Sequence, residues 1–170
     1  MGKGKMLVFS DVHGDSDGLK TLLSWGKGEM YDIVLNLGDL EPDAEMETLS
    51  YNIVSVMGNM DRYHYFTLMP DPPGKRKLTF DGKTVFLIHD GRAFPYDAPF
   101  LKPGDIYISG HTHVPELSKT ESGIFKLNPG SLSRPRSKKY GKTFISIEDG
   151  KALLLSFPAF SILEELPLEL

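Results

Sequence analysis

The first third of the chain alternates short apolar runs with segments of helical spacing, and this rhythm constrains the fold most. The runs have the length of strands buried on both faces, and the segments between them begin at polar residues that can cap a helix. The predicted elements are strands at Met6–Ser10, Ile33–Leu37 and Ile53–Met57, a helix capped by Ser16 or Asp17, and a short acidic helix at Pro42–Ser50. This order places crossover helices between parallel strands.

The rest of the chain changes to short strands joined by tight turns. Asp81-Gly82 and Asp149-Gly150 each separate two apolar segments, and Asp-Gly is a preferred two-residue hairpin turn. The strands predicted here are Lys77–Phe80, Thr84–Ile88, Ile106–Ser109, Glu116–Lys119, Ile124–Leu127, Thr143–Ile147 and Ala152–Phe157. We therefore expect an α/β fold with two sheets, parallel in the early part of the chain and antiparallel in the late part.

The 170 residues are expected to form a single domain, 1–170, whose apolar tail at 158–170 docks on the body or makes a contact in an oligomer. The chain has no cysteine, which excludes disulfides, thiolate metal sites and a cysteine nucleophile. The formal net charge of -4 gives no general reason to bind nucleic acid. Since we find no secretory signal and no apolar stretch of about 18 residues, we expect a cytoplasmic protein without a membrane partner.

Side chains of the kinds that bind metals follow the predicted strands directly. They are Asp11, His13, Asp39, Asn59, His89, His111 and His113. The carboxyl ends of parallel strands share one edge of a sheet, so loops far apart in the sequence would meet there. In an extended segment, side chains at i and i+2 project to the same side, so each Asp-x-His or His-x-His pair would deliver two ligands. The glycines at 38, 58 and 110 would allow tight turns beside these ligands.

The size and chemistry of this set favour a dinuclear metal centre. Each motif alone is more often a turn, a cap or a surface pair, whereas the full set favours a metal site. Oxygen and imidazole donors without thiolate suit Mn, Fe, Zn or Ni better than Ca or Mg. Two divalent transition-metal ions about 3.5–4 Å apart would use all seven ligands and could hold a phosphoryl group. We therefore predict hydrolysis of a phosphoester by a metal-bridging hydroxide, with Mn as the first choice of metal.

The order of the motifs resembles the calcineurin-like metallophosphoesterase superfamily, and within it the small YfcE-type phosphodiesterases of bacteria and archaea. The matching motifs are Ser10-Asp11-Val12-His13-Gly14, Gly38-Asp39, Gly58-Asn59-x-Asp61, His89, Gly110-His111-Thr112-His113-Val114-Pro115 and Asn128-Pro129-Gly130-Ser131. The resemblance runs from about residue 6 to residue 147. It implies a four-layer α/β/β/α sandwich of two mixed β-sheets and a small phosphodiester substrate.

The resemblance also implies a role for each residue of the site. One metal would be held by Asp11, His13 and His113. The other would be held by Asn59, His89 and His111, and Asp39 would bridge the two. Asp39, Asn59 and Asp61 would be the catalytic residues, with Asp61 beside the metals. The residues that orient the substrate would be Ser131, Arg134 and Arg136.

Two departures from the wider superfamily bear on mechanism. Many members carry a histidine after the asparagine that helps the leaving group depart, whereas this chain has Met60, and YfcE-type proteins generally lack the histidine too. A thioether cannot deliver a proton, and general-acid help is worth about 10²–10⁴-fold in rate, so we expect a bias toward good leaving groups. The family more often has His-Gly-His or His-Gly-Asp where this chain has His89-Asp90-Gly91, so that loop would have a different shape. We interpret His64 as an exposed loop residue, with a substitute acid as the alternative.

Several alternatives stay open at this stage. One is a phosphomonoesterase, and another is a scaffold like the retromer subunit, which resembles this family but has lost key ligands. A protein phosphatase is disfavoured by the short chain and by Met60, and nucleic-acid cleavage has little support. We interpret the basic segment Ser133–Lys142 as a solvated loop, with a phosphate-binding patch as the alternative. A homo-oligomer, dimer or tetramer, is also left open.

Overall fold

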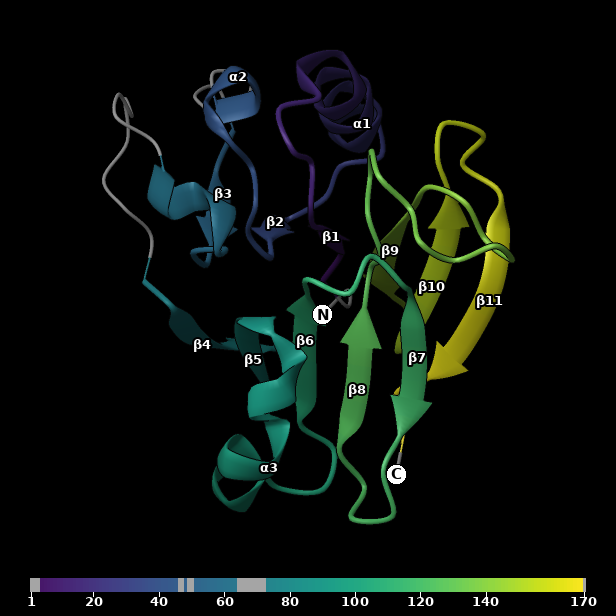
Figure 1. Ribbon diagram of the computed structural model, residues 1–170. Helices are drawn as coiled ribbons and strands as arrows, with labels where there is room; N and C mark the ends of the chain where they lie inside the picture. The colour runs from purple at the N-terminus through teal and green to yellow at the C-terminus, as the bar shows by residue number, and fades with distance from the viewer. Residues whose placement is uncertain (1–3, 46–47, 49–50, 64–72, 170) are drawn as a thin grey trace.

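Two mixed β-sheets stack on one another in the computed structural model, which describes residues 4–45, 48, 51–63 and 73–169 (Figure 1). The strand order is β11-β10-β9-β1-β2-β3 in the first sheet and β4-β5-β6-β8-β7 in the second. Buried side chains of both sheets pack into one apolar cluster, which includes Val8, Leu35 and Ile145 of the first sheet and Leu87 and Ile108 of the second. The main core therefore lies between the sheets.

The first sheet is parallel on one side and antiparallel on the other. Its strands are β1 (Met6–Phe9), β2 (Ile33–Asn36), β3 (Ile53–Ser55), β9 (Thr143–Glu148), β10 (Lys151–Ser156) and β11 (Ile162–Pro167). β1, β2 and β3 run parallel, with helices α1 (Ser16–Gly28) and α2 (Pro42–Glu45) in the crossovers. This confirms the strand–helix–strand pattern predicted from the sequence.

The starts and ends of the two helices differ in detail from the prediction. Asp15 is the cap of α1, because its carboxylate accepts a hydrogen bond from the Gly18 N–H at 3.0 Å. The cap therefore lies one residue before Ser16, the earlier of the two predicted positions. The helix expected over Pro42–Ser50 is observed at Pro42–Glu45, and residues 46–47 and 49–50 lie outside the described part of the chain.

The second sheet is parallel in its centre, so the expectation of an antiparallel late half is wrong there. Its strands are β4 (Lys75–Phe80), β5 (Lys83–Asp90), β6 (Ile106–Gly110), β7 (Glu116–Lys119) and β8 (Phe125–Asn128), and β5, β6 and β8 run parallel. The crossover from β5 to β6 runs through three very short helices, η3 (Gly91–Ala93), α3 (Phe94–Asp97) and η4 (Ala98–Phe100). Helices of three or four residues are too short to show a helical period in the sequence.

Both predicted hairpin turns are confirmed. Asp81 and Gly82 join β4 to β5 with φ of 48° and 76°, and Asp149 and Gly150 join β9 to β10 with φ of 50° and 73°. A turn in which both central residues have positive φ matches the twist of the two strands that it connects.

The predicted four-layer architecture is confirmed by the packing on the outer faces. Met6 and Val8 of β1 point into the core between the sheets, whereas Leu7 and Phe9 pack with α1 residues on the other face. A separate cluster covers the outer face of the second sheet, where Phe94 packs against β-sheet residues. Figure 1 shows α1 and α2 on the side of β1–β3, and α3 beside β5 and β6.

The apolar tail docks by completing the first sheet. Strand β11 pairs antiparallel with β10, and the Leu168 N–H donates to the Gly150 carbonyl at 2.8 Å. The side chain of Leu168 is buried in the core between the sheets. β11 is an edge strand in which exposed and half-buried residues alternate. The apolar composition of the tail hides this alternation in the sequence. Among the described helices, none is long and apolar enough to cross a membrane.

Candidate metal centre

The loops after five strands meet at one place between the two sheets. Asp11 and His13 follow β1, Asp39 follows β2, and Asn59 follows β3. From the second sheet come His89, at the end of β5, and His111 and His113, directly after β6. Backbone hydrogen bonds join the first two loops, because the Asp11 N–H donates to Gly38 O at 3.0 Å and the His13 N–H to Asp39 O at 2.9 Å. The His111 N–H also donates to Asp11 Oδ2 at 2.9 Å, so a hydrogen bond joins residues 100 positions apart.

Asp11, His13 and His113 form the first group of donors. The Nε2 atoms of His113 and His13 lie 3.2 and 3.7 Å from Asp11 Oδ1, and 3.1 Å from each other. The ligand atoms of the three residues all lie within 4.8 Å of one another. This is the set that the family resemblance implied for one metal.

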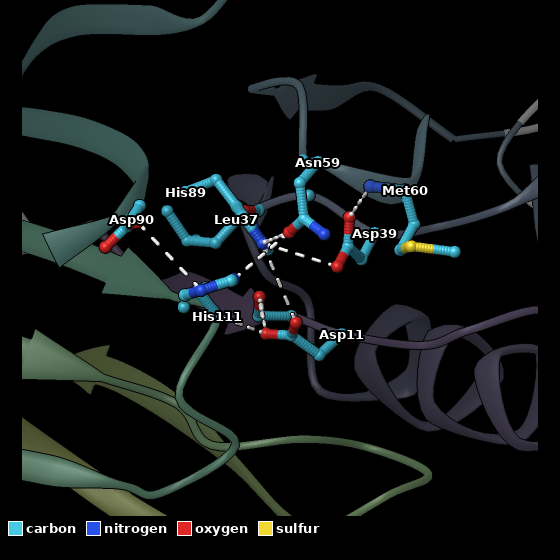
Figure 2. A network of polar contacts seen from close by, with 12 residues as sticks. Asp11, Leu37, Asp39, Asn59, Met60, His89, Asp90 and His111 are labelled. Atoms are coloured by element: carbon cyan, nitrogen blue, oxygen red, sulfur yellow. Dashed lines mark hydrogen bonds and ion pairs between the residues drawn. The ribbon is translucent and has the colours of Figure 1, made fainter. Parts of the chain in front are cut away.

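Asn59, His89 and His111 form the second group, and Asp39 lies between the groups. Asn59 Oδ1 is 3.1 Å from both His89 Nε2 and His111 Nδ1. Figure 2 shows these three side chains pointing toward one another. Asp39 Oδ2 is 3.4 Å from His89 Nε2 and 3.9 Å from His13 Nε2. Asp11 also approaches the second group, since Asp11, Asp39 and His89 form another cluster within 4.8 Å. Both carboxylates therefore lie between the two sets of imidazoles.

The arrangement has the features of a site built for cations. Asp11 is fully buried, and its Oδ1 is the buried side-chain oxygen without a hydrogen bond among the described residues. A buried carboxylate oxygen without a partner is costly unless a cation or a donor satisfies it. The donors are oxygens and imidazole nitrogens, a set that suits divalent transition metals. The residues present therefore fit metal ions.

Backbone carbonyls fix the tautomers of two ligand histidines. His89 Nδ1 lies 2.6 Å from Leu37 O, and His113 Nδ1 lies 2.6 Å from Arg134 O. A carbonyl can only accept, so each Nδ1 carries the proton and each Nε2 presents its lone pair to the site. In His111, Nδ1 faces the site and lies near Asn59 Oδ1. The Nε2 atom of His111 lies 3.9 Å from a carboxylate oxygen of Asp90.

The pKa shifts favour negative charge on two carboxylates of the site and positive charge on two of its imidazoles. Burial opposes ionisation of Asp11, but contacts with His113 and His13 outweigh it and hold its pKa well below the ordinary value. Burial also opposes ionisation of Asp39, where contact with His89 lowers the pKa. Contact with Asp11 raises the pKa of His13, and contact with Asp39 raises that of His89 against its burial. In the metal-free protein, the carboxylates of Asp11 and Asp39 thus favour the protonated forms of His13 and His89.

Five of the seven predicted ligands adopt a left-handed backbone conformation, which corrects the sequence argument. The φ angles are 54° for Asp11, 48° for His13, 56° for Asp39, 69° for His111 and 59° for His113. The paired ligands are therefore not in extended segments, and their shared direction comes from tight turns instead. Such conformations cost about 1–3 kcal/mol each for residues other than glycine, and they cluster at functional sites.

Two glycines let the ligand loops approach one another. Gly38 has φ of +104°, and a Cβ there would lie 2.6 Å from Gly58 N and 2.7 Å from His89 Nδ1. A Cβ on Gly58 would lie 2.1 Å from Asp39 Oδ1. Any side chain at either position would push a ligand out of place.

Asp61 and Ser131 shape the loops from within the protein. The Asp61 carboxylate accepts hydrogen bonds from the backbone N–H groups of Asp39, Leu40, Glu41 and Gly58 at 2.7–3.3 Å. Ser131 is fully buried, and its hydroxyl donates to Asp11 O at 2.7 Å and accepts from the Arg134 N–H at 2.8 Å. Both side chains hold ligand loops, so any effect of Ser131 on a substrate would be indirect.

The ligands open onto a pocket of about 450 Å³. Besides ligands, its wall contains Met60, Arg134, Pro135 and Arg136. Part of the basic segment at 133–142 thus belongs to the wall of the site, although the segment was interpreted as a solvated loop. Met60, in the short helix η2 (Met60–Tyr63), is 38% exposed, and His64 lies outside the described residues.

Comparison with protein families accounts for this geometry. The model of the calcineurin-like phosphoesterase superfamily domain matches residues 5–150. The chain belongs to this superfamily. A probable metallophosphoesterase of Methanothermobacter thermautotrophicus is 36% identical over 115 residues, which is 62% of this chain and 63% of that protein. The matched region is therefore less than two-thirds of that relative's length.

The phosphodiesterase YfcE of Escherichia coli is 23% identical over 150 residues, which is 78% of this chain and 81% of YfcE. The YfcE structure superposes with a TM-score of 0.84, 19% identity, and coverage of 97% of this chain and 100% of that chain. Vacuolar Protein Sorting 29 from Cryptosporidium parvum gives a TM-score of 0.71 at 18% identity, covering 98% of this chain and 100% of that chain. At these identities the two structures establish the shared fold, which confirms the predicted architecture.

Proposed function

We propose that the chain is a metal-dependent phosphodiesterase that binds two divalent transition-metal ions, with Mn as the first candidate. One observation carries the proposal: seven oxygen and imidazole donors converge beside an open pocket, around a buried carboxylate oxygen that accepts no hydrogen bond from the described residues. The names of the relatives, probable metallophosphoesterase and phosphodiesterase YfcE, support the same reaction class.

Each ligand has a part in the proposed site. Asp11, His13 and His113 would hold one ion, and Asn59, His89 and His111 the other. Asp39 would bridge them, supported by the position of its carboxylate between His13 and His89. When bound, such a pair of ions polarises the phosphoryl group and supplies a nucleophilic water at neutral pH.

Side chains of the pocket wall would orient the substrate and limit the leaving groups that the site can release. Arg134 and Arg136 line the pocket and can orient an anionic substrate through their guanidinium groups. Met60 lines the same pocket but cannot donate a proton to a leaving group. We therefore propose small phosphodiesters with good leaving groups as substrates.

A scaffold role is the second candidate, supported by the structural likeness to Vacuolar Protein Sorting 29. The intact donor set favours catalysis over this role, because a surface used for partner binding does not need seven converging metal ligands.

Metal analysis combined with a paired activity assay tests the proposal. We expect purified protein to bind two equivalents of Mn²⁺ and to hydrolyse bis(4-nitrophenyl) phosphate faster than 4-nitrophenyl phosphate. His89→Ala should abolish turnover, whereas Glu121→Gln, in an exposed turn, should leave it unchanged. Absence of turnover with Mn²⁺, Fe²⁺, Zn²⁺ and Ni²⁺ would favour the scaffold, and a preference for the monoester would favour a phosphomonoesterase.

A further inference from the structure

The segment Arg134-Pro135-Arg136 is fixed to the metal centre by its backbone. Its Arg134 carbonyl lies 2.6 Å from His113 Nδ1, and the Arg136 N–H donates to His113 O at 3.0 Å. The Arg134 N–H also donates to the buried Ser131 hydroxyl at 2.8 Å. The segment therefore has one position relative to the ligand histidine, although both arginine side chains are exposed.

The two guanidinium groups have no acidic partner among the described residues. Other exposed cations of the described chain do form such pairs, for example Arg92 with Asp90 and Lys139 with Glu164. Arg134 and Arg136 instead both line the pocket that contains the ligands. The fixed backbone keeps the two unpaired guanidinium groups within reach of the pocket, where they can bind an anion.

The scissile phosphodiester alone does not account for these two charges. It carries one negative charge, and two divalent ions already exceed the charge of Asp11 and Asp39. The pocket of about 450 Å³ also lies in the range that holds whole small molecules, so a phosphoryl group at the metals leaves space beside it. A second anionic group of the same substrate would meet the arginines there.

We propose that the substrate is a phosphodiester that carries a further phosphate group, and that Arg134 and Arg136 bind this second phosphate. The inference rests on the proposed function, because it needs the scissile group to lie at the metals. Phosphate is the preferred anion because the planar guanidinium donates two parallel hydrogen bonds to its oxygens.

Two substrates with the same leaving group test the inference. Thymidine 5′-(4-nitrophenyl phosphate) and its 3′-phosphorylated counterpart both release 4-nitrophenol, and only the second carries a further phosphate. We expect wild-type protein with Mn²⁺ to show a kcat/KM about tenfold higher for the 3′-phosphorylated substrate, the size typical of one well-formed charge-assisted contact. The double variant Arg134→Gln/Arg136→Gln should reduce this ratio to about one.

A matched control separates local contact from overall charge. Lys138→Gln/Lys139→Gln removes the same charge from the same segment at positions outside the pocket wall. It should retain the tenfold ratio. Equal loss of the ratio in both double variants would overturn the inference, because the effect would then come from net charge.

Binding of the products provides a readout that does not need turnover. Calorimetry should show that wild-type protein binds thymidine 3′,5′-bisphosphate about tenfold more tightly than thymidine 5′-phosphate, and that the arginine variant does not. Turnover of both substrates at equal kcat/KM would overturn the second-phosphate site and leave the proposed function intact. Absence of turnover would contradict the proposed function, and equal binding of the two products would then overturn the inference as well.

Discussion

Replacement of Asp61 by alanine should loosen the metal centre and destabilise the metal-free protein. The Asp61 carboxylate accepts four backbone N–H groups, two on each oxygen. Hydrogen bonds to charged groups contribute about 1.5–3 kcal/mol each when buried, and partial exposure reduces this to about 1 kcal/mol per bond. Loss of all four therefore costs about 4 kcal/mol. Asparagine keeps one acceptor oxygen, so Asp61→Asn should cost about half as much.

Thermal unfolding in the presence of EDTA measures this effect directly. For a chain of this size, 1 kcal/mol shifts Tm by about 2–4 °C, so Asp61→Ala should lower Tm by roughly 8–16 °C and Asp61→Asn by about half of that. Mn²⁺ affinity, measured by calorimetry, should fall in the same order, because the Asp39 loop loses its support. Glu121→Gln is the control, because it removes an acidic group at an exposed position. A wild-type Tm and a wild-type Mn²⁺ affinity for Asp61→Ala would refute the reasoning.

Three further predictions follow from the same site. Asp90→Asn should weaken Mn²⁺ binding roughly tenfold or more, because it removes the carboxylate that faces the outer nitrogen of His111; unchanged affinity in calorimetry would contradict this role. The raised pKa values of His13 and His89 stabilise the metal-free protein fully below the unfolded value of about 6.5, and this stability is lost as pH rises through the folded values. Tm in EDTA should therefore fall as the pH rises above about 6.5. The increase in Tm caused by Mn²⁺ should grow over the same range, because protons compete with the metal for the imidazoles. Parallel trends in both series would count against this ligand set. Met60→His should increase turnover of an alkyl phosphodiester more than that of bis(4-nitrophenyl) phosphate, since only the poor leaving group needs an acid; equal changes for the two would remove the proposed reason for the leaving-group bias.

The parts of the fold that follow from local chemistry could be predicted. The apolar runs at β1 and β2 and the Asp-Gly turns carry their own signals, and these elements lie where the sequence placed them. The three short helices after β5 carry no such signal, because a segment of three or four residues cannot show a helical period. Because these helices could not be predicted, the sequence did not indicate a crossover from β5 to β6. The parallel centre of the second sheet was therefore not expected.

The candidate site could be predicted in composition but not in conformation. The position of each ligand after a strand indicates which residues converge, since the strand ends share one edge. No local signal in Asp11, His13 or His113 indicates a positive φ, because tertiary contacts impose that strain. The hydrogen bonds that Asp61 accepts from the ligand loops could not be predicted either. Its partners are backbone N–H groups, which do not depend on the type of residue.

The position of β1 in the first sheet has a consequence for how the protein acquires its site. β1 pairs on one side with β2 and on the other with β9, where Met6 lies opposite Ile147. The strand that leads to Asp11 therefore lacks one neighbour until β9, at Thr143–Glu148, has been synthesised. Pairings between such distant segments form slowly, because a long loop must close first. We therefore expect the loop of Asp11 to take its final position late in folding, after β9 has paired with β1.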